Sequence, residues 1–407
     1  MNLIDPKIVL DKKEGVVEIK NYINKLKIVK ELYTLGNNTA SNICQLVGIS
    51  LPTVNLLLTD LLEEKIIIKE GRGQSQGGRK PDLYGLAPDS FYILGIDLNR
   101  FGAKAAIYNT KNEKVSDIKS IKLSLNNELE TLDAIYDFSM EIIHSSGIPE
   151  EKVIAVGISM PGLVDSVSGV NHTYLKSGKK TLKDQLEEKF SRKVFIENDA
   201  RAKTLAEFKF ANKGTNKNVM GIFVDWGIGL GIIIDEKLYR GYSGFAGEFS
   251  HSPLFDAKEI SCTCGKRGCL EAVASGGAVV RLAKEAILLD KDSILAKLSD
   301  GKEENLEPST VVEAAISILS DVGLDLGRGI AILIQLLNPE LIILGGAIAE
   351  AKQYITTPIQ QALNIYSMAK LREKTSIELS QLGMEVGLRG AIAIVNEHIF
   401  EDTINSQ

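Results

Sequence analysis

Three cysteines and one histidine lie close together in the sequence and carry the side chains of a metal site. His251 is followed by Cys262, Cys264 and Cys269, which together offer one imidazole and three thiolates. This is the ligand set of a closed tetrahedral zinc site, in which four protein ligands leave no coordination position open for catalysis. In a reducing cytosol such a cluster favours a metal over disulfides, and three buried free thiols are the alternative. We therefore predict a structural zinc.

Acidic and amide side chains occur on both sides of this cluster. Asn198 and Asp199 directly follow a short apolar segment, Glu248 precedes His251, and Glu271 follows the last cysteine of the cluster. Binding of a polyol requires paired hydrogen-bond donors and acceptors of this kind. Each acid taken singly could instead be a solvated surface charge. The amide and carboxylate pair at Asn198 and Asp199 is of the kind that a polyol needs.

The elements that would hold these residues alternate between strands and helices. Short β-branched segments with helical segments between them indicate α/β architecture. The pattern fits two α/β lobes with a cleft between them, where strand ends and glycine turns usually bind ligands. Strands are expected at 92–98, 105–109, 153–160, 194–197, 219–224, 231–234 and 341–344, and a helix at 130–144.

The N-terminal residues have a different pattern, which predicts three short helices. Apolar residues recur at helical spacing from Ile19 to Tyr33 and stop at Gly36. A second helix is expected at 40–47, and Ser50 is placed to cap a third. The side chains expected to face inward are Ile43, Leu46 and Val47 of the second helix and Val54, Leu57, Leu58, Leu61 and Leu62 of the third.

The outward face of the third helix predicts contact with DNA. Thr53, Asn55, Leu56 and Thr59 are small or polar enough to approach base edges in a major groove, although no arginine is among them. A plain helical bundle that contacts another protein is the alternative interpretation.

A basic hairpin is expected directly after these helices. The β-branched segments at 66–69 and 83–86 flank the tract GRGQSQGGRKP, which carries Arg72, Arg79 and Lys80 among glycines. Such a wing brings cations to phosphates or to a narrow minor groove. A flexible linker between domains would explain the glycines but not the clustered cations.

Length and charge restrict the function classes. A chain of 407 residues predicts two or three domains, and a net charge of −6 argues against a protein that coats nucleic acid with its whole surface. Residues 1–90 carry 12 basic and 11 acidic side chains, so the acidic excess lies in the remainder. The apolar stretch 331–349 is interrupted by Asn338, Pro339 and Glu340, and the N-terminus lacks a signal-peptide pattern. We therefore expect a cytoplasmic protein that does not enter a membrane.

Several motifs resemble those of the ROK family of repressors and sugar kinases. The matching segments are SQGGRKP, SMPGLVD, ENDA, GYSGFAGEFSHSPLF and CTCGKRGCLEAVAS. The resemblance implies a winged helix-turn-helix DNA-binding domain at 1–88 with its wing at 66–86, followed by an actin-like, sugar-kinase-like ATPase fold. Its first α/β lobe would comprise 89–200 and about 381–407, and its second lobe, with the zinc loop, 201–380.

The resemblance also implies roles for particular residues. His251 would use one ring nitrogen for zinc and the other for the sugar. The implied sugar-binding residues are Gly162, Asn198, Asp199, Glu248, His251 and Glu271. The expected DNA-binding residues are Ser50, Thr53, Asn55, Thr59, Arg72, Ser75, Arg79 and Lys80.

Two segments argue against phosphoryl transfer. In the family's kinases Asp199 would be the general base, but catalysis also needs two glycine-rich phosphate loops. Where those kinases have Asp-x-Gly-Gly-Thr and Gly-Thr-Gly-x-Gly, this chain has DLNRF at 97–101 and DWGIG at 225–229. Asp225 would repel a phosphate and Trp226 would block its approach.

We therefore expect no enzyme but a sugar-responsive repressor, a homodimer or tetramer that binds double-stranded operator DNA. Within the family, the wing tract and the altered loops look most like those of the xylose repressors. Two alternatives stay open: an ATP-dependent sugar kinase with an extra N-terminal module, and a protein that binds only other proteins.

Overall fold

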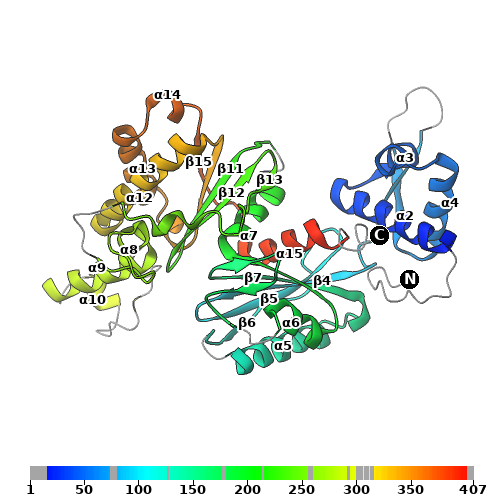
Figure 1. Cartoon of the computed structure of the whole chain (residues 1–407), viewed down its shortest axis with the longest axis horizontal. Coiled ribbons are helices and arrows are strands. Elements are labelled where there is room, and N and C mark those ends of the chain that lie inside the picture. The colour runs from blue at the N-terminus through cyan, green and yellow to red at the C-terminus, as the bar shows by residue number, and fades with distance from the viewer. Residues whose placement is uncertain are drawn as a thin grey trace. The chain divides into compact units, whose positions relative to one another are not determined.

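The computed structural model of the chain divides into two compact units, each described separately here (Figure 1). Unit 1 comprises Met1–Gly162, Ser166–Glu197 and Ala391–Gln407, and unit 2 comprises Leu163–Asp165 and Asn198–Gly390. The predicted division into a DNA-binding domain that ends at residue 88 and two lobes with boundaries near residues 200 and 380 stays a prediction. The described residues are 16–73, 80–125, 128–176, 180–212, 215–254, 260–290, 294–298, 306, 311 and 316–400, so Ser75 and Arg79 lie outside them.

The N-terminal part of unit 1 consists of helices followed by a small antiparallel sheet. The helices are α2 (Val16–Leu35), α3 (Ala40–Val47) and α4 (Leu51–Glu63), and the strands β1 (Asn38–Thr39), β2 (Ile67–Arg72) and β3 (Asp82–Leu86) are arranged in the order β1-β3-β2. Thr39 and Ser50 cap α3 and α4, and Gly48 at φ 71° makes the turn between them. These helices agree with the predicted ones.

Burial in these helices agrees with the predictions only in part. On α4 the side chains of Val54, Leu57, Leu58 and Leu61 are buried as expected. The prediction that Leu46 faces inward is wrong, because that side chain is 47% exposed. Ile28 of α2 is fully buried although it lies off the expected apolar stripe, because α2 is covered on more than one side.

Some of the residues that pack against α2 are distant from it in sequence. The Tyr33 hydroxyl at the end of α2 donates a hydrogen bond to Asn396, and Asn112 lies 3.3 Å away. Its ring packs against Phe91 and Phe400 with centroids 5.7 and 5.9 Å apart. Burial raises the pKa of the Tyr33 hydroxyl far above its usual range. A second contact joins the Lys111 ammonium to the Glu70 carboxylate of β2.

The rest of unit 1 is built on a five-stranded sheet with the order β10-β7-β4-β5-β6. In this sheet β4 pairs in parallel with β7 and in antiparallel orientation with β5. The bounds are β4 (Tyr92–Asn99), β5 (Gly102–Asn109), β6 (Lys119–Lys122), β7 (Val153–Met160) and β10 (Lys193–Asn198), with β9 (Val170–Asn171), α5 (Glu128–Ser145), η1 (Glu150–Lys152) and α6 (Leu182–Phe190) between them.

Helix α15 (Val386–His398) begins in unit 2 and ends in unit 1. Its later half packs closely on β7, because a Cβ at Gly157 would lie 2.1 Å from the Ala391 carbonyl oxygen. Only glycine permits this approach of helix to strand. The Tyr33 partner Asn396 lies on the same half of α15.

Unit 2 is built on a second five-stranded sheet, with the order β13-β12-β11-β14-β15. Here β14 is parallel to both β11 and β15. The strands are β11 (Val219–Val224), β12 (Ile228–Ile234), β13 (Lys237–Leu238), β14 (Leu341–Gly345) and β15 (Ser376–Leu379), and the short β8 (Val164–Asp165) also belongs to this unit.

Helices cover both faces of this sheet (Figure 1). Helix α7 (Asp199–Ala206), continued by η2 (Glu207–Ala211), packs on β11 and β12. The other face packs in the main core against α8 (Leu270–Ala274), α9 (Gly276–Leu289), α12 (Ile316–Leu337) and α13 (Gln353–Tyr366). The remaining elements are η3 (Glu248–His251), α10 (Ile294–Leu298), η5 (Ala347–Ala351), α14 (Ala369–Arg372) and η6 (Gly383–Glu385).

The α/β architecture predicted from the strand pattern is confirmed by these layers. Among the described residues, no helix is by itself both long and apolar enough to cross a bilayer.

Candidate sugar and metal site

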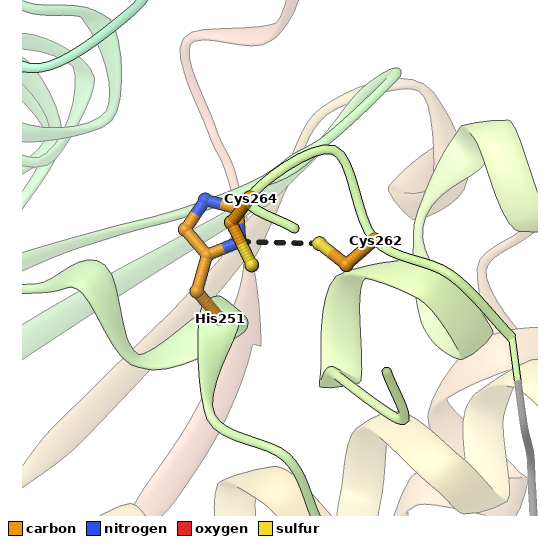
Figure 2. Close-up of side chains that lie close together, drawn as sticks. All are labelled: His251, Cys262 and Cys264. Carbon is orange, nitrogen blue, oxygen red and sulfur yellow. Dashed lines mark hydrogen bonds between the residues drawn. The ribbon is translucent and has the colours of Figure 1, made fainter. Parts of the chain in front are cut away.

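Three of the four predicted metal ligands, His251, Cys262 and Cys264, come together in unit 2. His251 ends η3, Cys262 and Cys264 lie on the following loop, and Cys269 caps α8. The ligand atoms of His251, Cys262 and Cys264 all lie within 4.8 Å of one another (Figure 2). Cys269 is not one of this group of three, although its sulfur lies 3.7 Å from that of Cys264 and 3.3 Å from the His251 carbonyl oxygen.

The distances fit a tetrahedral zinc. With Zn–S of about 2.3 Å and Zn–N of about 2.0 Å, a tetrahedron separates sulfur from nitrogen by about 3.5 Å and two sulfurs by about 3.8 Å. The Cys262 sulfur lies 3.4 Å from His251 Nδ1, and the Cys264 and Cys269 sulfurs are 3.7 Å apart. The thiols of Cys262 and Cys264 and the imidazole of His251, whose ligand atoms all lie within 4.8 Å of one another, are therefore the groups that could hold one ion.

The thiols differ in electrostatic environment. A hydrogen bond from the Lys266 backbone lowers the pKa of Cys264, whereas burial raises the pKa of Cys269 to about 12. Cys262 and Cys269 are buried and Cys264 is exposed. A divalent metal would stabilise the thiolate of a buried cysteine such as Cys269.

Asn198 and Asp199 sit at the start of α7, directly after β10. The Asn198 side-chain oxygen accepts hydrogen bonds from the backbone of Ala200 and Arg201, and so caps the helix. Its amide nitrogen lies 3.2 Å from Asp199 Oδ1. Capping fixes the amide group beside the carboxylate, which gives an adjacent donor and acceptor pair.

His251 links the metal ligands to the acidic residues. Its Nδ1 faces the thiols and lies 3.9 Å from Glu271 Oε1, whereas its Nε2 lies 4.0 Å from Glu248 Oε2. The two nitrogens thus face different groups, and the implied division between zinc and sugar stays a prediction. The other carboxylate oxygen of Glu271, Oε2, accepts a hydrogen bond of 3.2 Å from the Ile228 backbone N–H, which fixes the side chain.

The acidic residues of unit 2 are electrostatically coupled. Burial raises the pKa of the Glu248 carboxyl, the Glu271 and Asp199 carboxylates raise it further, and His251 and Arg201 oppose the rise. The contacts bring the predicted sugar residues of unit 2 together in two sets, Glu248, His251 and Glu271 in one and Asn198 and Asp199 in the other.

Gly162 is the exception, because it belongs to unit 1. It adopts φ 99°, and a Cβ there would lie 2.9 Å from the Asn171 side-chain oxygen. The positive φ and the close contact both require glycine at this position. The presence of glycine here is therefore explained by the backbone alone, and it does not need a bound ligand as its reason.

Two cations of α7 were missed by sequence reasoning. Arg201 is buried and donates hydrogen bonds of 2.6 Å to the carbonyls of Val164 and Gly244. Lys203 is 11% exposed, and its ammonium lies 3.5 Å from Asp199 and 3.0 Å from Asp225. The four-residue spacing of Asp199 and Lys203 was the one available signal, since such pairs meet on a helix.

The two altered loops have defined conformations. Asn99 Oδ1 accepts a hydrogen bond from the Phe101 backbone in the turn between β4 and β5, and the Phe101 ring is 52% exposed. In unit 2 the Trp226 side chain packs partly buried against the main core. Both loops are therefore shaped by side chains that the glycines of a phosphate loop would not supply.

The expected DNA-binding residues that the structure describes lie on α4 and the hairpin. Asn55 and Thr59 are exposed on α4, and Ser50 and Thr53 bond to each other through their hydroxyls, 2.7 Å apart, at its start. Arg72 ends β2 opposite Asp82 of β3, and Lys80 precedes that strand.

Known structures define the class of the protein. A ROK family transcriptional regulator, described as a homolog of the E. coli Mlc protein, matches 95% of this chain and 98% of its own with a TM-score of 0.78 and 23% identity. A ROK family glucokinase from Streptomyces griseus, in complex with glucose and AMPPNP, matches 74% of this chain and 97% of its own with a TM-score of 0.64 and 27% identity. The fold is therefore that of the sugar kinases and their regulator relatives.

The ROK family model matches residues 93–398, so the chain belongs to the ROK family. The xylose repressor of Caldicellulosiruptor bescii is 29% identical over 385 residues, which cover 92% of this chain and 95% of that protein. The family resemblance predicted from the motifs is confirmed.

Proposed function

We propose that this protein is a cytoplasmic, sugar-responsive transcriptional repressor that binds operator DNA as a homodimer or tetramer. The observation that carries the proposal is the extent of the similarities: the repressor and the regulator match more than 90% of the chain, whereas the glucokinase matches 74%. The additional part is the N-terminal helices and hairpin, which we assign as a winged helix-turn-helix. Its α4 would enter the major groove, and its hairpin would contact phosphates.

The constellation in unit 2 supports the sensing part of the proposal. Asn198, Asp199, Glu248 and Glu271 would hold sugar hydroxyls. A structural zinc bound by His251 and the cysteines would fix the ring of His251 so that Nε2 reaches the sugar. The xylose repressors make D-xylose the first sugar to test.

Phosphoryl transfer is not part of the proposed function. The reaction depends on groups that position and stabilise phosphate charge. Asp225 places a carboxylate, and Asn99 and Arg100 place side chains, where the family's kinases carry glycines. The general-base candidate Asp199 would then serve only to bind the sugar.

The test is a thermal-shift screen of D-xylose, D-glucose, N-acetylglucosamine and their phosphates, with and without Mg-ATP. One sugar is expected to raise the unfolding temperature and to alter binding to the promoter DNA of the chain's own gene. Asp199→Asn and Glu248→Gln are each expected to lower the affinity for that sugar at least about tenfold, because a hydrogen bond to a charged group contributes about 1.5–3 kcal/mol.

The exposed Glu373→Gln serves as the charge-matched control and should bind like the parent chain. Sugar-dependent release of ADP from ATP would favour the kinase instead. DNA binding that ignores every sugar, together with no thermal shift, would refute the sensing role.

The Tyr33 contact offers a route from sugar to DNA. Helix α15 takes part in both units, and its residue Asn396 accepts the hydrogen bond from Tyr33 of α2. A change in the position of α15 would therefore reach the N-terminal helices directly. This gives the coupling a physical contact through which to act.

Removing the hydroxyl with Tyr33→Phe should uncouple the two activities. We expect sugar affinity to stay unchanged and sugar-free DNA affinity to stay within about threefold, while the sugar-induced change in DNA affinity shrinks about 3- to 10-fold. Fluorescence anisotropy of labelled promoter DNA, titrated with and without sugar, measures all three. Tyr354→Phe, an exposed tyrosine of α13, is the control. A full sugar response in Tyr33→Phe would exclude this route.

A further inference from the structure

Lys203 and Asp225 form an ion pair that neither sugar binding nor zinc binding uses. The Lys203 side chain is almost buried, and its ammonium lies 3.0 Å from Asp225 Oδ2 and 5.6 Å from the centre of the Phe223 ring. A nearly buried ammonium must be compensated by anions nearby. Asp199, at 3.5 Å, is the other carboxylate beside it.

The second oxygen of Asp225 has a different donor. Asp225 follows β11, and its Oδ1 accepts a hydrogen bond of 2.8 Å from the Ala347 backbone in the turn after β14. In that turn Gly346 has φ 85°, and a Cβ would lie 2.5 Å from the Val224 carbonyl oxygen. The turn thus approaches the end of β11 closely, with its N–H directed at the carboxylate.

These contacts describe an oxyanion site with an anion already in it. A carboxylate lies between a buried ammonium and a backbone N–H, at the carboxyl ends of two adjacent parallel strands, where α/β proteins commonly bind ligands. Phosphate has the same requirement for charged and backbone donors. We propose that the Asp225 side chain is an internal substitute for a phosphate, which fills the site formed by Lys203 Nζ and Ala347 N–H and excludes inorganic phosphate from it.

This inference does not depend on sugar or DNA binding, and phosphate itself is the probe. Asp225→Gly removes the internal anion and leaves the ammonium and the N–H in place. We expect it to bind inorganic phosphate at least about tenfold more tightly than the parent chain, because a carboxylate a few ångströms away no longer repels the ligand. Trp226, the single tryptophan, is adjacent and reports binding by its fluorescence at constant ionic strength.

Three further variants separate the contributions. Asp225→Ala should gain phosphate binding like Asp225→Gly, and it takes the place of that variant if the glycine chain does not fold. Asp225→Asn keeps the volume filled and should gain little. Lys203→Met combined with Asp225→Gly should lose the gain. Denaturation curves and calorimetric titration accompany each measurement.

The outcomes are distinct. Phosphate binding in Asp225→Gly that is abolished by Lys203→Met supports the proposal. A folded Asp225→Gly or Asp225→Ala chain that binds no more phosphate than the parent would overturn it, as would equal binding with and without Lys203. None of these results bears on whether the parent chain senses a sugar, which the thermal-shift screen decides separately.

Discussion

Replacing Arg72, Arg79 and Lys80 together by alanine is expected to weaken promoter binding by about 100- to 1000-fold near 0.1 M salt. Each cation that neutralises a DNA phosphate releases condensed counterions and adds about 0.9 to the slope of log K against log salt. Loss of three such contacts should make that slope shallower by about 3. Arg72 ends β2 and Lys80 precedes β3, so both flank the hairpin tip. The measurement is anisotropy of labelled DNA at several salt concentrations.

A control with the same change in charge distinguishes the wing from general electrostatics. Lys122, Lys370 and Lys374 are exposed lysines away from the hairpin. Their combined replacement by alanine should change affinity only a few-fold and keep the slope. If both triple variants lose the same affinity, the hairpin has no special contact with DNA. If neither does, the hairpin cations do not contribute to promoter binding, and the predicted wing contact is wrong.

Cys262→Ser is expected to abolish stoichiometric zinc and to lower the unfolding temperature. Structural zinc contributes directly to the free energy of folding, and a serine hydroxyl is a poor ligand for it. Sugar binding should be lost with the metal, because the ring of His251 would no longer be held between Cys262 and Glu248. Elemental analysis of protein purified without added metal, together with thermal unfolding, measures both effects.

Cys44→Ser is the matched control for this experiment. Cys44 lies in the N-terminal part, where its thiol donates to the Ile49 carbonyl, 2.8 Å away. This variant should retain one zinc per chain and an unchanged sugar response. A parent chain that is purified without metal, or a Cys262→Ser chain that still holds one equivalent, would refute the structural zinc.

Periodic features of the fold could be predicted because they repeat in sequence. The strand at 153–160 and the helix at 40–47 have the predicted bounds, and Val54, Leu57, Leu58 and Leu61 are buried at helical spacing. Leu46 was placed inside because apolar residues usually are, yet α3 is short and has only Ile43 fully buried. Ile28 was missed because its burial depends on residues that pack against α2 from other parts of the chain.

The candidate site shows the same limit. Clustered cysteines and ENDA could be singled out from the sequence because their members are close neighbours in the chain, and the structure brings Cys262 and Cys264 together with His251. Lys203 and Asp225, which are 22 residues apart, could not be paired, because their contact depends on how α7 packs across the end of β11. Asp225 was predicted to repel phosphate, and the structure adds the groups that hold its carboxylate. The contact between Tyr33 and Asn396, which are 363 residues apart, could not be predicted because no local sequence pattern indicates it.

The position of Asp225 also has a consequence for physiology. A kinase of this fold responds to two variables, the sugar and the adenylate pool, because its site must hold both. A chain whose own carboxylate fills the anion position would respond to one. Its control of transcription should then depend on sugar concentration at any ratio of ATP to ADP. At the same sugar concentration, a starved cell and a well-fed cell would therefore transcribe the controlled genes to the same extent.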